Sequence, residues 1–368
     1  MIKGKKIAVV LMTATLSIAM LAGCGSKKFD LEKYGEKAVV TVDGESVSFW
    51  DANFQARLLQ TQYESMYGTD IWTQKLQGED TFETSMKSVL LDGLKINQAT
   101  LNHAKDYKVE LTEEEKKSIE EQADLFLEQV TDEFKALTNP DKEKVESYLE
   151  DTLTIQKVAS EVAKEGNITV SDEEARQVKV NYVVFKVESD ATDKAKTKAK
   201  QQATKLMNHA KDTKSLAQSA KALKLDVNEA TYGKNNDQIP QEIVTESMAL
   251  KKGEITKPIK TDYGYYVIQC MEETDKDATK TAKEELVSEK QMEYYNTTSQ
   301  KWVSESDVKV DEELWDLIKF ENNSTLPKAE STENTTSAES TTGQESTTSA
   351  ESTTGQESTT SAESTTAK

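Results

Sequence analysis

Few side chains in this 368-residue sequence could form a reactive or metal-binding group. The sequence contains two histidines, His103 and His209, and two cysteines, Cys24 and Cys270. Each histidine falls in a polar stretch with helical spacing, which favours a surface position over a metal ligand. One free cysteine and two scattered histidines cannot form a tetrahedral zinc site. No nucleophile elbow, phosphate-binding loop or dinucleotide fingerprint occurs. We therefore predict no metal and no cofactor.

The most informative stretch is residues 250–270, where turn and strand signals follow closely on one another. Gly253 is predicted to end a short helix that carries Ile243. Pro258 favours extended backbone before it, and Gly264 is expected to adopt a positive φ in the turn Asp-Tyr-Gly. The run Tyr-Tyr-Val-Ile-Gln-Cys that follows is typical of a buried strand. This order of helix, glycine, extended proline segment, glycine turn and strand resembles the closing segment of parvulin-type peptidyl-prolyl isomerase domains.

The parvulin resemblance implies an active site with two histidines on neighbouring strands and an apolar pocket for proline. Tyr182 stands in Asn-Tyr-Val-Val where the family has Ser-His-Ile-Leu. Tyr266 stands in Tyr-Gly-Tyr-Tyr where the family has Phe-Gly-Tyr-His. The matching pocket positions are Tyr232, Gln238 and either Glu242 or, with a one-residue slip, Ile243. Because both imidazoles are replaced by phenols, we expect prolyl isomerisation to be weak or lost.

A pair of phenols does not by itself abolish isomerisation. Isomerases lower a rotation barrier of roughly 20 kcal/mol mainly by holding the twisted amide with hydrogen bonds, and a phenol both donates and accepts them. An active isomerase that uses Tyr182 and Tyr266 therefore stays as an alternative. Against it, Gln238 and Glu242 would place polar groups in the proline pocket. We favour the interpretation that the two tyrosines fill the core of a small domain.

The N-terminus has the pattern of a bacterial lipoprotein signal peptide. Three lysines within residues 1–6 precede an apolar run at 7–21, which is too short to span a membrane well, and Leu-Ala-Gly-Cys follows. This ending resembles the lipobox, which implies that Cys24 is acylated and becomes the mature N-terminus. An ordinary secretory leader is the alternative. Cys270 then has no disulfide partner and is expected to be a small buried strand residue.

Hydrophobic periodicity, together with the lipobox and parvulin resemblances, divides the chain into six segments and predicts an α+β fold. These are a signal peptide at 1–23, a linker at 24–37, a helical region at 38–170, a parvulin-like domain at 171–275, further helices at 276–320 and a Ser/Thr/Glu repeat tail at 321–368. The helical region opens with two short strands around an Asp-Gly turn and resembles the N-terminal chaperone region of the SurA and PrsA families. The tail has too few apolar side chains to offset the entropy of ordering, so we expect it to be disordered.

Local signals add further expectations within these segments. A capping box at residues 112–115 predicts one helix through to 137, and residues 231–240 are expected to be irregular. In the parvulin-like domain we predict a strand at 178–187 and another from 265. The apolar side chains expected to pack back on the helical region are Leu314, Trp315 and Phe320.

The formal net charge of −20 excludes the basic surface that nucleic-acid binding requires, and it suits a soluble surface that attracts basic polypeptides. The PrsA resemblance over residues 39–320 implies an extracytoplasmic foldase, lipid-anchored to the cell membrane. It would bind unfolded secreted proteins in a cleft between the helical region and the parvulin-like domain. A non-catalytic surface interaction protein or scaffold is a further alternative. The sequence does not decide between a monomer and a homodimer.

Overall fold

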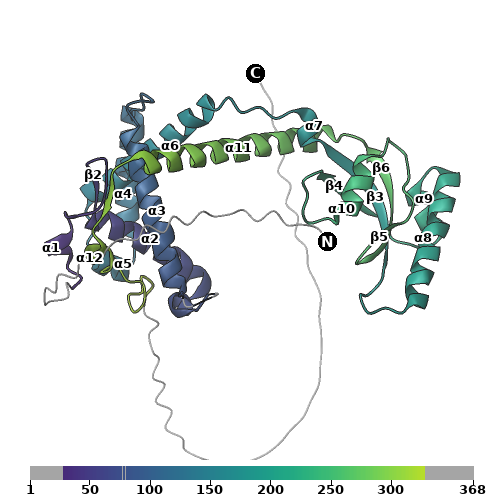
Figure 1. The fold of residues 1–368 in the computed structure, drawn as a ribbon, viewed down its shortest axis with the longest axis horizontal. Coiled ribbons are helices and arrows are strands. Elements are labelled where there is room, and N and C mark those ends of the chain that lie inside the picture. Colours follow the sequence, from purple (N-terminus) through teal and green to yellow (C-terminus); the bar gives the residue numbers. More distant parts are fainter. Residues whose placement is uncertain (1–27, 77, 79, 328–368) are drawn as a thin grey trace, which may run out of the picture. The chain divides into compact units, whose positions relative to one another are not determined.

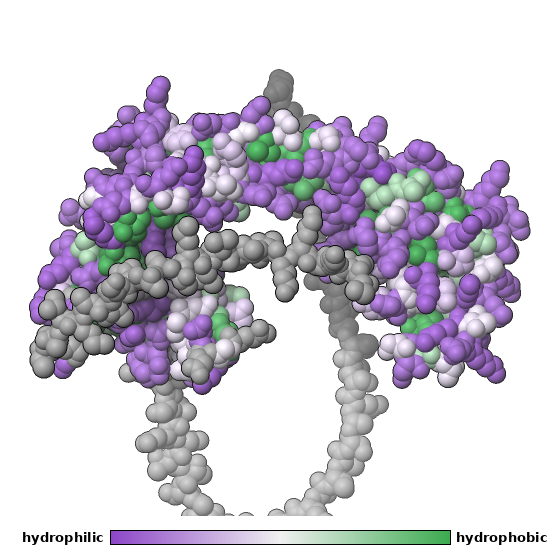
Figure 2. All heavy atoms as spheres, in the orientation of Figure 1, coloured by the Kyte–Doolittle hydropathy of each residue, from purple (hydrophilic) through white to green (hydrophobic). Residues whose placement is uncertain are grey.

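The computed structural model describes residues 28–327 except 77 and 79, so the predicted signal peptide, Cys24 and most of the repeat tail lie outside the described residues. Within the described part the chain is α+β, as predicted, with helices and two antiparallel sheets (Figure 1). Hydrophilic residues cover most of the face seen in Figure 2, and hydrophobic residues form separate smaller areas. No helix of the described residues has the length and apolar character needed to cross a membrane.

The first sheet has the strand order β2-β1-β7, and its strands are β1 (Ala38–Val42), β2 (Glu45–Ser48) and β7 (Val308–Val310). Asp43 and Gly44 join β1 to β2 with φ values of 53° and 93°, which confirms the predicted Asp-Gly turn. The sequence did not reveal β7. Three residues are too few for a clear alternating pattern, and its partner β1 lies near the other end of the chain.

The helices of this region are α1 (Leu31–Tyr34), α2 (Phe49–Tyr67), the 3₁₀ helix η1 (Thr69–Thr73), α3 (Phe82–Asn102), α4 (Glu113–Gln129), α5 (Asp132–Thr138) and α6 (Lys142–Glu165). The predicted capping box forms at the start of α4, where Thr112 and Glu115 bond to each other's backbone N–H groups. The prediction of one helix as far as residue 137 is wrong. Thr131 accepts a hydrogen bond from the N–H of Phe134 and starts α5, and such local bonding competes with helix continuation.

The chain returns to the first sheet at its end, through α11 (Lys276–Glu305), β7 and α12 (Glu312–Trp315). Four apolar side chains of this returning segment are buried in the same core as Phe49, Trp72 and Leu94: Leu314, Trp315, Ile318 and Phe320. The rings of Phe320 and Trp72 have centroids 4.5 Å apart. The core beside the first sheet is therefore built from both ends of the described chain.

A row of buried polar side chains on α2 binds the backbone of the returning segment. Arg57 donates a 2.8 Å hydrogen bond to the carbonyl oxygen of Lys319. Gln60 donates to the carbonyl oxygens of Phe320 and Asn323. Glu64 accepts from the N–H of Thr325 at 3.1 Å. All three side chains are almost completely buried. Buried polar groups of this kind are stable only when hydrogen-bonded, so the returning segment and α2 depend on each other.

The second sheet has the strand order β4-β3-β6-β5, with neighbouring strands antiparallel. Its strands are β3 (Gln177–Lys186), β4 (Asn228–Gly233), β5 (Ile259–Thr261) and β6 (Gly264–Glu272), and the helices around it are α7 (Asp172–Ala175), α8 (Asp193–Thr213), α9 (Leu216–Ala222) and α10 (Gln241–Met248). The structure confirms the predicted β3 and β6. It corrects the expectation of irregular chain after residue 230, because β4 pairs with β3 although Asn, Glu and Gly rarely favour strands.

The two faces of this sheet pack against different helices. Val183 and Phe185 of β3 face α8 and α9, whereas Val178, Val180 and Tyr182 alternate with them and face the side of α10. Figure 1 shows α8 and α9 on one side of β3 and β6, and α10 on the other. The alternation of side chains along a strand therefore places Tyr182 on the α10 side.

The two glycines of the closing segment have different roles from each other. Gly264 has a φ of 134° in the β5–β6 turn, as predicted, and an added Cβ would lie 2.1 Å from the carbonyl oxygen of Phe185. Gly253 also has a positive φ, of 85°, but it does not end the helix as predicted. α10 ends earlier, with Ala249 as its C-cap, and the N–H of Gly253 donates to the carbonyl of Cys270 at 2.8 Å.

Candidate functional site

A cavity of about 180 Å³ opens on the α10 side of the second sheet, and we call it the tyrosine cavity. Five of the six positions that the parvulin resemblance offered for the active site and proline pocket line it, and the alternative Glu242 does not: Tyr182, Tyr232, Gln238, Ile243 and Tyr266. These residues come from the strands β3, β4 and β6, from the helix α10 and from the loop before it. They therefore meet at one place, as the resemblance implied. Cys24, the predicted lipidation site, lies outside the described residues.

Tyr182 and Tyr266 are diagonal neighbours on the central strand pair. Tyr182 lies opposite Ile268, and Tyr266 lies opposite Val184, so both side chains are on the same face of β3 and β6. Their ring centroids are 6.0 Å apart and their planes are inclined by 33°. Among the described residues neither phenol hydroxyl has a hydrogen-bond partner. Both hydroxyls are thus free to bond to a ligand or to water.

Two phenols of this cavity, those of Tyr232 and Tyr266, stay protonated at neutral pH. Burial raises the pKa of Tyr266 above its ordinary value of 10.0, and the neighbouring Tyr182 raises it further. Burial also raises the pKa of Tyr232, whose hydroxyl donates a 2.8 Å hydrogen bond to Ser247. Such neutral phenols can donate and accept hydrogen bonds, but they do not act as bases near pH 7.

The walls of the cavity are more apolar than the sequence led us to expect. Gln238 is exposed, and its side-chain amide donates to Asp237 at 3.0 Å. Glu242 lines a different surface groove, between α10 and β5, while Ile239 and Ile243 line the tyrosine cavity. The expectation is therefore wrong for Glu242, whereas Gln238 is among the lining residues as predicted.

Four lining residues were not predicted: Ala230, Ile239, Pro240 and Ile268. Ile268 follows from strand alternation, because it lies two residues beyond Tyr266 and opposite Tyr182. Ile239 was missed because it lies in the loop before α10, where no periodic pattern indicates which side chain faces the cavity. Ala230 lies on β4, a strand that the sequence did not reveal.

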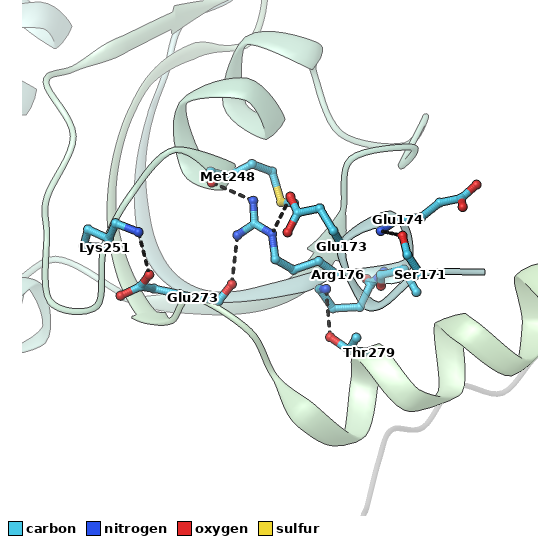
Figure 3. Close-up of polar contacts among 10 residues, drawn as sticks. Ser171, Glu173, Glu174, Arg176, Met248, Lys251, Glu273 and Thr279 are labelled. Carbon is cyan, nitrogen blue, oxygen red and sulfur yellow. Dashed lines mark hydrogen bonds and ion pairs between the residues drawn. The ribbon is translucent and has the colours of Figure 1, made fainter. Parts of the chain in front are cut away.

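Arg176 fixes the position of α10, which carries Ile243 of the cavity wall. Its guanidinium donates to the carbonyl oxygen of Met248 at 2.9 Å and to that of Glu273 at 3.0 Å, and its Nε lies 3.5 Å from the Glu173 carboxylate (Figure 3). Met248 ends α10, where the helix dipole favours a cation. Arg176 thus links three parts of the chain: the segment before β3, the segment after β6 and the helix α10 of the cavity wall.

Comparison with known proteins places this geometry in a family context. Residues 182–272 match the family model described as "Rotamase: PPIC-type PPIASE domain". The foldase protein PrsA of Clostridium botulinum strain Loch Maree is 26% identical over 337 residues, which cover 83% of this chain and 97% of that protein. The foldase protein PrsA of Caldanaerobacter subterraneus is 27% identical over 278 residues, covering 72% of this chain and 82% of that protein.

The chain is thus similar to PrsA foldases over most of its length, and its residues 182–272 match a PPIC-type domain. The predicted resemblance to PrsA-type foldases is therefore confirmed. Among solved structures, the peptidylprolyl isomerase PrsA from Bacillus cereus matches with a TM-score of 0.32 and 15% identity, covering 77% of this chain and 97% of that one. The foldase protein PrsA from Lactococcus lactis matches with a TM-score of 0.32 and 17% identity, covering 77% and 99%.

Other titratable groups of this PrsA-like protein lie away from the tyrosine cavity. His103 stacks on Trp302, with ring centroids 4.2 Å apart, and bonds to Asp106 at 2.7 Å. His209 bonds to Ser219 at 2.8 Å, so both histidines have local structural partners. Cys270 is buried, and burial raises the pKa of its thiol. Across residues 28–327, apart from 77 and 79, no three His, Cys, Asp or Glu side chains cluster in a way that could hold a metal ion.

Proposed function

We propose that this chain is a membrane-anchored, extracytoplasmic foldase that binds unfolded secreted proteins and has weak or no prolyl isomerase activity. The observation that carries the proposal is the tyrosine cavity, which keeps an apolar lining for a peptide side chain but presents two phenols where the family has imidazoles. The similarity to proteins described as foldase protein PrsA supports the same proposal. The proposed activity is therefore the binding of polypeptide segments rather than catalysis of prolyl isomerisation.

The physical basis is the difference between a binding surface and a catalyst. An apolar cavity of about 180 Å³ can hold a proline ring or another small apolar side chain, and the free hydroxyls of Tyr182 and Tyr266 can hold the adjoining backbone. Isomerisation also requires the hydrogen bonds to favour the twisted amide over the planar one. A phenol is longer than an imidazole, so hydroxyls placed for the planar amide need not fit the twisted one.

We propose the following organisation for this function. Cys24 carries the lipid anchor, residues 38–170 form the chaperone region, residues 171–275 form the parvulin-like domain, and residues 276–320 return to the chaperone region. The anchor would hold the protein at the outer face of the cell membrane, where secreted chains emerge unfolded. Radiolabelled palmitate incorporation into the wild-type chain, and its loss in Cys24→Ala, is the expected result of a labelling experiment in a bacterial host.

Isomerase activity is tested first, because the intact apolar cavity favours an active enzyme as the second candidate. NMR exchange spectroscopy on a short Ala-Pro peptide is expected to show no rate gain over the uncatalysed reaction. The double substitution Tyr182→His with Tyr266→His is the matched variant and is expected to raise the rate, because it restores both imidazoles in a preserved cavity. A clear gain by the wild-type protein that Tyr182→Phe and Tyr266→Phe both abolish would establish the active isomerase instead.

Chaperone activity is tested separately from catalysis. The purified protein is expected to suppress the light scattering of a reduced, aggregating secreted protein in proportion to its concentration. Neither tyrosine-to-phenylalanine variant should abolish that effect, since most of the cavity lining is unchanged. A protein that neither prevents aggregation nor speeds refolding is better described as a non-catalytic surface scaffold, and the foldase proposal would then be dropped.

A further inference from the structure

A second cavity, of about 240 Å³, lies within the helical region between α2, α3 and α6, and we call it the acidic cavity. Part of its lining is apolar and comes from Leu94, Leu101 and Ile155. Amide side chains from all three helices line the remainder, among them Gln55 and Asn97. Neither of these two amides has a hydrogen-bond partner among the described residues. The cavity thus combines an apolar surface with groups that can bond to a peptide backbone.

Two carboxylates, Asp51 and Asp151, are the charged groups of the described lining. Asp51 is held in place by the capping box of α2, since its Oδ2 accepts from the N–H and the hydroxyl of Ser48 at 3.2 Å and 2.5 Å. Asp151 makes no hydrogen bond or ion pair with any described residue. No lysine or arginine among the described residues lines this cavity, so the two like charges lack a counter-ion.

The arrangement carries an electrostatic cost that an incoming cation would relieve. Desolvation, together with the carboxylates of Asp51 and the adjacent Glu150, raises the pKa of Asp151 from 3.8 to about 6. The capping role accounts for Asp51. It does not account for Asp151, which lies on the exposed side of α6 and contributes no bond to the fold. Unpaired, perturbed carboxylates in a concave site are typical of functional positions.

We propose that the acidic cavity binds a lysine or arginine side chain of an unfolded polypeptide, with its charged group between Asp51 and Asp151. The aliphatic stem would lie on the apolar part of the lining, and the free amides would bond to the neighbouring backbone. The inference rests on the proposed client binding and adds a second contact point, of defined chemistry, to the tyrosine cavity. The net charge of −20 would bring basic segments toward the protein before they bind.

The test compares two peptides that differ in one charge. The full-length protein is titrated by calorimetry with the capped peptide Gly-Leu-Ala-Lys-Ala-Leu-Gly and with its glutamine counterpart. We expect the lysine peptide to bind about fivefold to tenfold more tightly, the range for a cation near two partly exposed carboxylates. Asp151→Asn should reduce its affinity to that of the glutamine peptide. Glu161→Gln removes the same charge from the same helix outside the cavity and should leave the difference intact.

A second variant keeps both carboxylates and fills the site. Gln55→Lys places a tethered ammonium on α2 four residues after Asp51, and it should abolish the preference for the lysine peptide. Equal affinities for the two peptides in the wild-type protein, or an unchanged preference in Asp151→Asn, would overturn the inference. Aggregation suppression measured on the same samples separates the two proposals. A wild-type protein that fails to suppress aggregation but still prefers the lysine peptide would contradict the foldase function and not the lysine preference.

Stability provides an independent readout on Asp151→Asn. Because the folded-state pKa of Asp151 lies above its ordinary value, its negative charge lowers stability above about pH 6, and this cost disappears as the pH falls toward 4. We therefore expect Asp151→Asn to raise the unfolding midpoint at neutral pH while weakening peptide binding, and to lose the stability gain in acid. A lower midpoint at neutral pH would show that the carboxylate is structural and would count against the inference.

Discussion

At the scale of single residues, the geometry of the tyrosine cavity depends on Gly264, which is not one of its lining residues. Gly264 begins β6 two residues before Tyr266, and its φ of 134° brings its backbone against Phe185 of β3. A side chain at this position would push the two strands apart and change the spacing of Tyr182 and Tyr266. Both the pairing of β3 with β6 and the geometry of the cavity therefore require a residue without a Cβ at position 264.

Gly264→Ala is expected to lower the free energy of unfolding by about 2–4 kcal/mol, because the added Cβ would lie 2.1 Å from a main-chain oxygen in a left-handed conformation. Urea unfolding followed by far-UV circular dichroism measures the change. Gly93→Ala is the matched control, since nothing lies within 4 Å of its added Cβ in the interior of α3. It should stabilise the protein by up to about 1 kcal/mol. Equal effects of the two substitutions would contradict the steric argument.

Much of the site could be predicted at this scale, and the errors have identifiable causes. Tyr182, Tyr266 and Gly264 lie on strands with strong sequence patterns, so their register follows from the pattern. Gln238 and Ile239 both lie in a loop, where no strand or helix period indicates which side chains face the cavity. Gly253 was assigned to a helix end because a positive φ is common there, but the same conformation serves the turn that bonds to Cys270.

At the scale of elements, α10 is the part of the cavity whose position depends on a single cation. Its last carbonyl, that of Met248, and the carbonyl of Glu273 after β6 both accept from Arg176. Replacing the guanidinium leaves two partly buried carbonyls without their donor. The cost is about 1–3 kcal/mol for each group that stays unsatisfied, and it falls on α10 rather than on the β3–β6 pair.

Arg176→Met is expected to speed amide hydrogen exchange in α10 while leaving the central strands protected. Arg176→Lys should have an intermediate effect, because an ammonium reaches one carbonyl but cannot span both as a planar guanidinium does. Hydrogen exchange followed by mass spectrometry resolves peptides from residues 241–248 and from β6. Faster exchange in β6 with no change in α10 would show that Arg176 supports the sheet and not the cavity wall.

The elements that the sequence did not reveal share a physical feature. β4 and β7 depend on hydrogen bonds from a partner strand: β4 contains Asn, Glu and Gly, which rarely favour strands, and β7 is only three residues long. Long helices such as α3 and α6 carry their signal within themselves and were predicted. Thr131 ends the continuity between α4 and α5 by a side-chain bond that hydrophobic spacing cannot show, since Val130 and Phe134 still fit the helical period.

At the scale of the whole molecule, Glu64 connects the two ends of the described chain. Its carboxylate accepts hydrogen bonds from Gln60, from the indole of Trp72 at 3.0 Å, from the hydroxyl of Ser324, and from both the N–H and the hydroxyl of Thr325. Gln60, Trp72 and Thr325 are buried, so water cannot easily replace the carboxylate as their acceptor. The helical region is therefore stable only with its returning segment in place.

Glu64→Leu is expected to lower the free energy of unfolding by about 3–5 kcal/mol, because several buried donors lose their acceptor at once. Tryptophan fluorescence during urea unfolding reports the transition, since Trp72 is one of the donors. Glu64→Gln keeps one carbonyl acceptor in the same volume and should cost clearly less. If both substitutions prove equally mild, the network contributes little and apolar packing alone holds the returning segment.

The pairing of β1 with β7 has a consequence for biosynthesis. Val40 finds its partner in Val310, and the entire PPIC-type domain is encoded between them. During synthesis, that domain can fold as soon as it emerges, while the earlier-made helices wait with an incomplete sheet until the last strand has been made. A protein proposed to bind unfolded chains would thus itself be partly unfolded for a time during its synthesis. The time between the synthesis of β1 and that of β7 would lengthen with every residue inserted between these two strands.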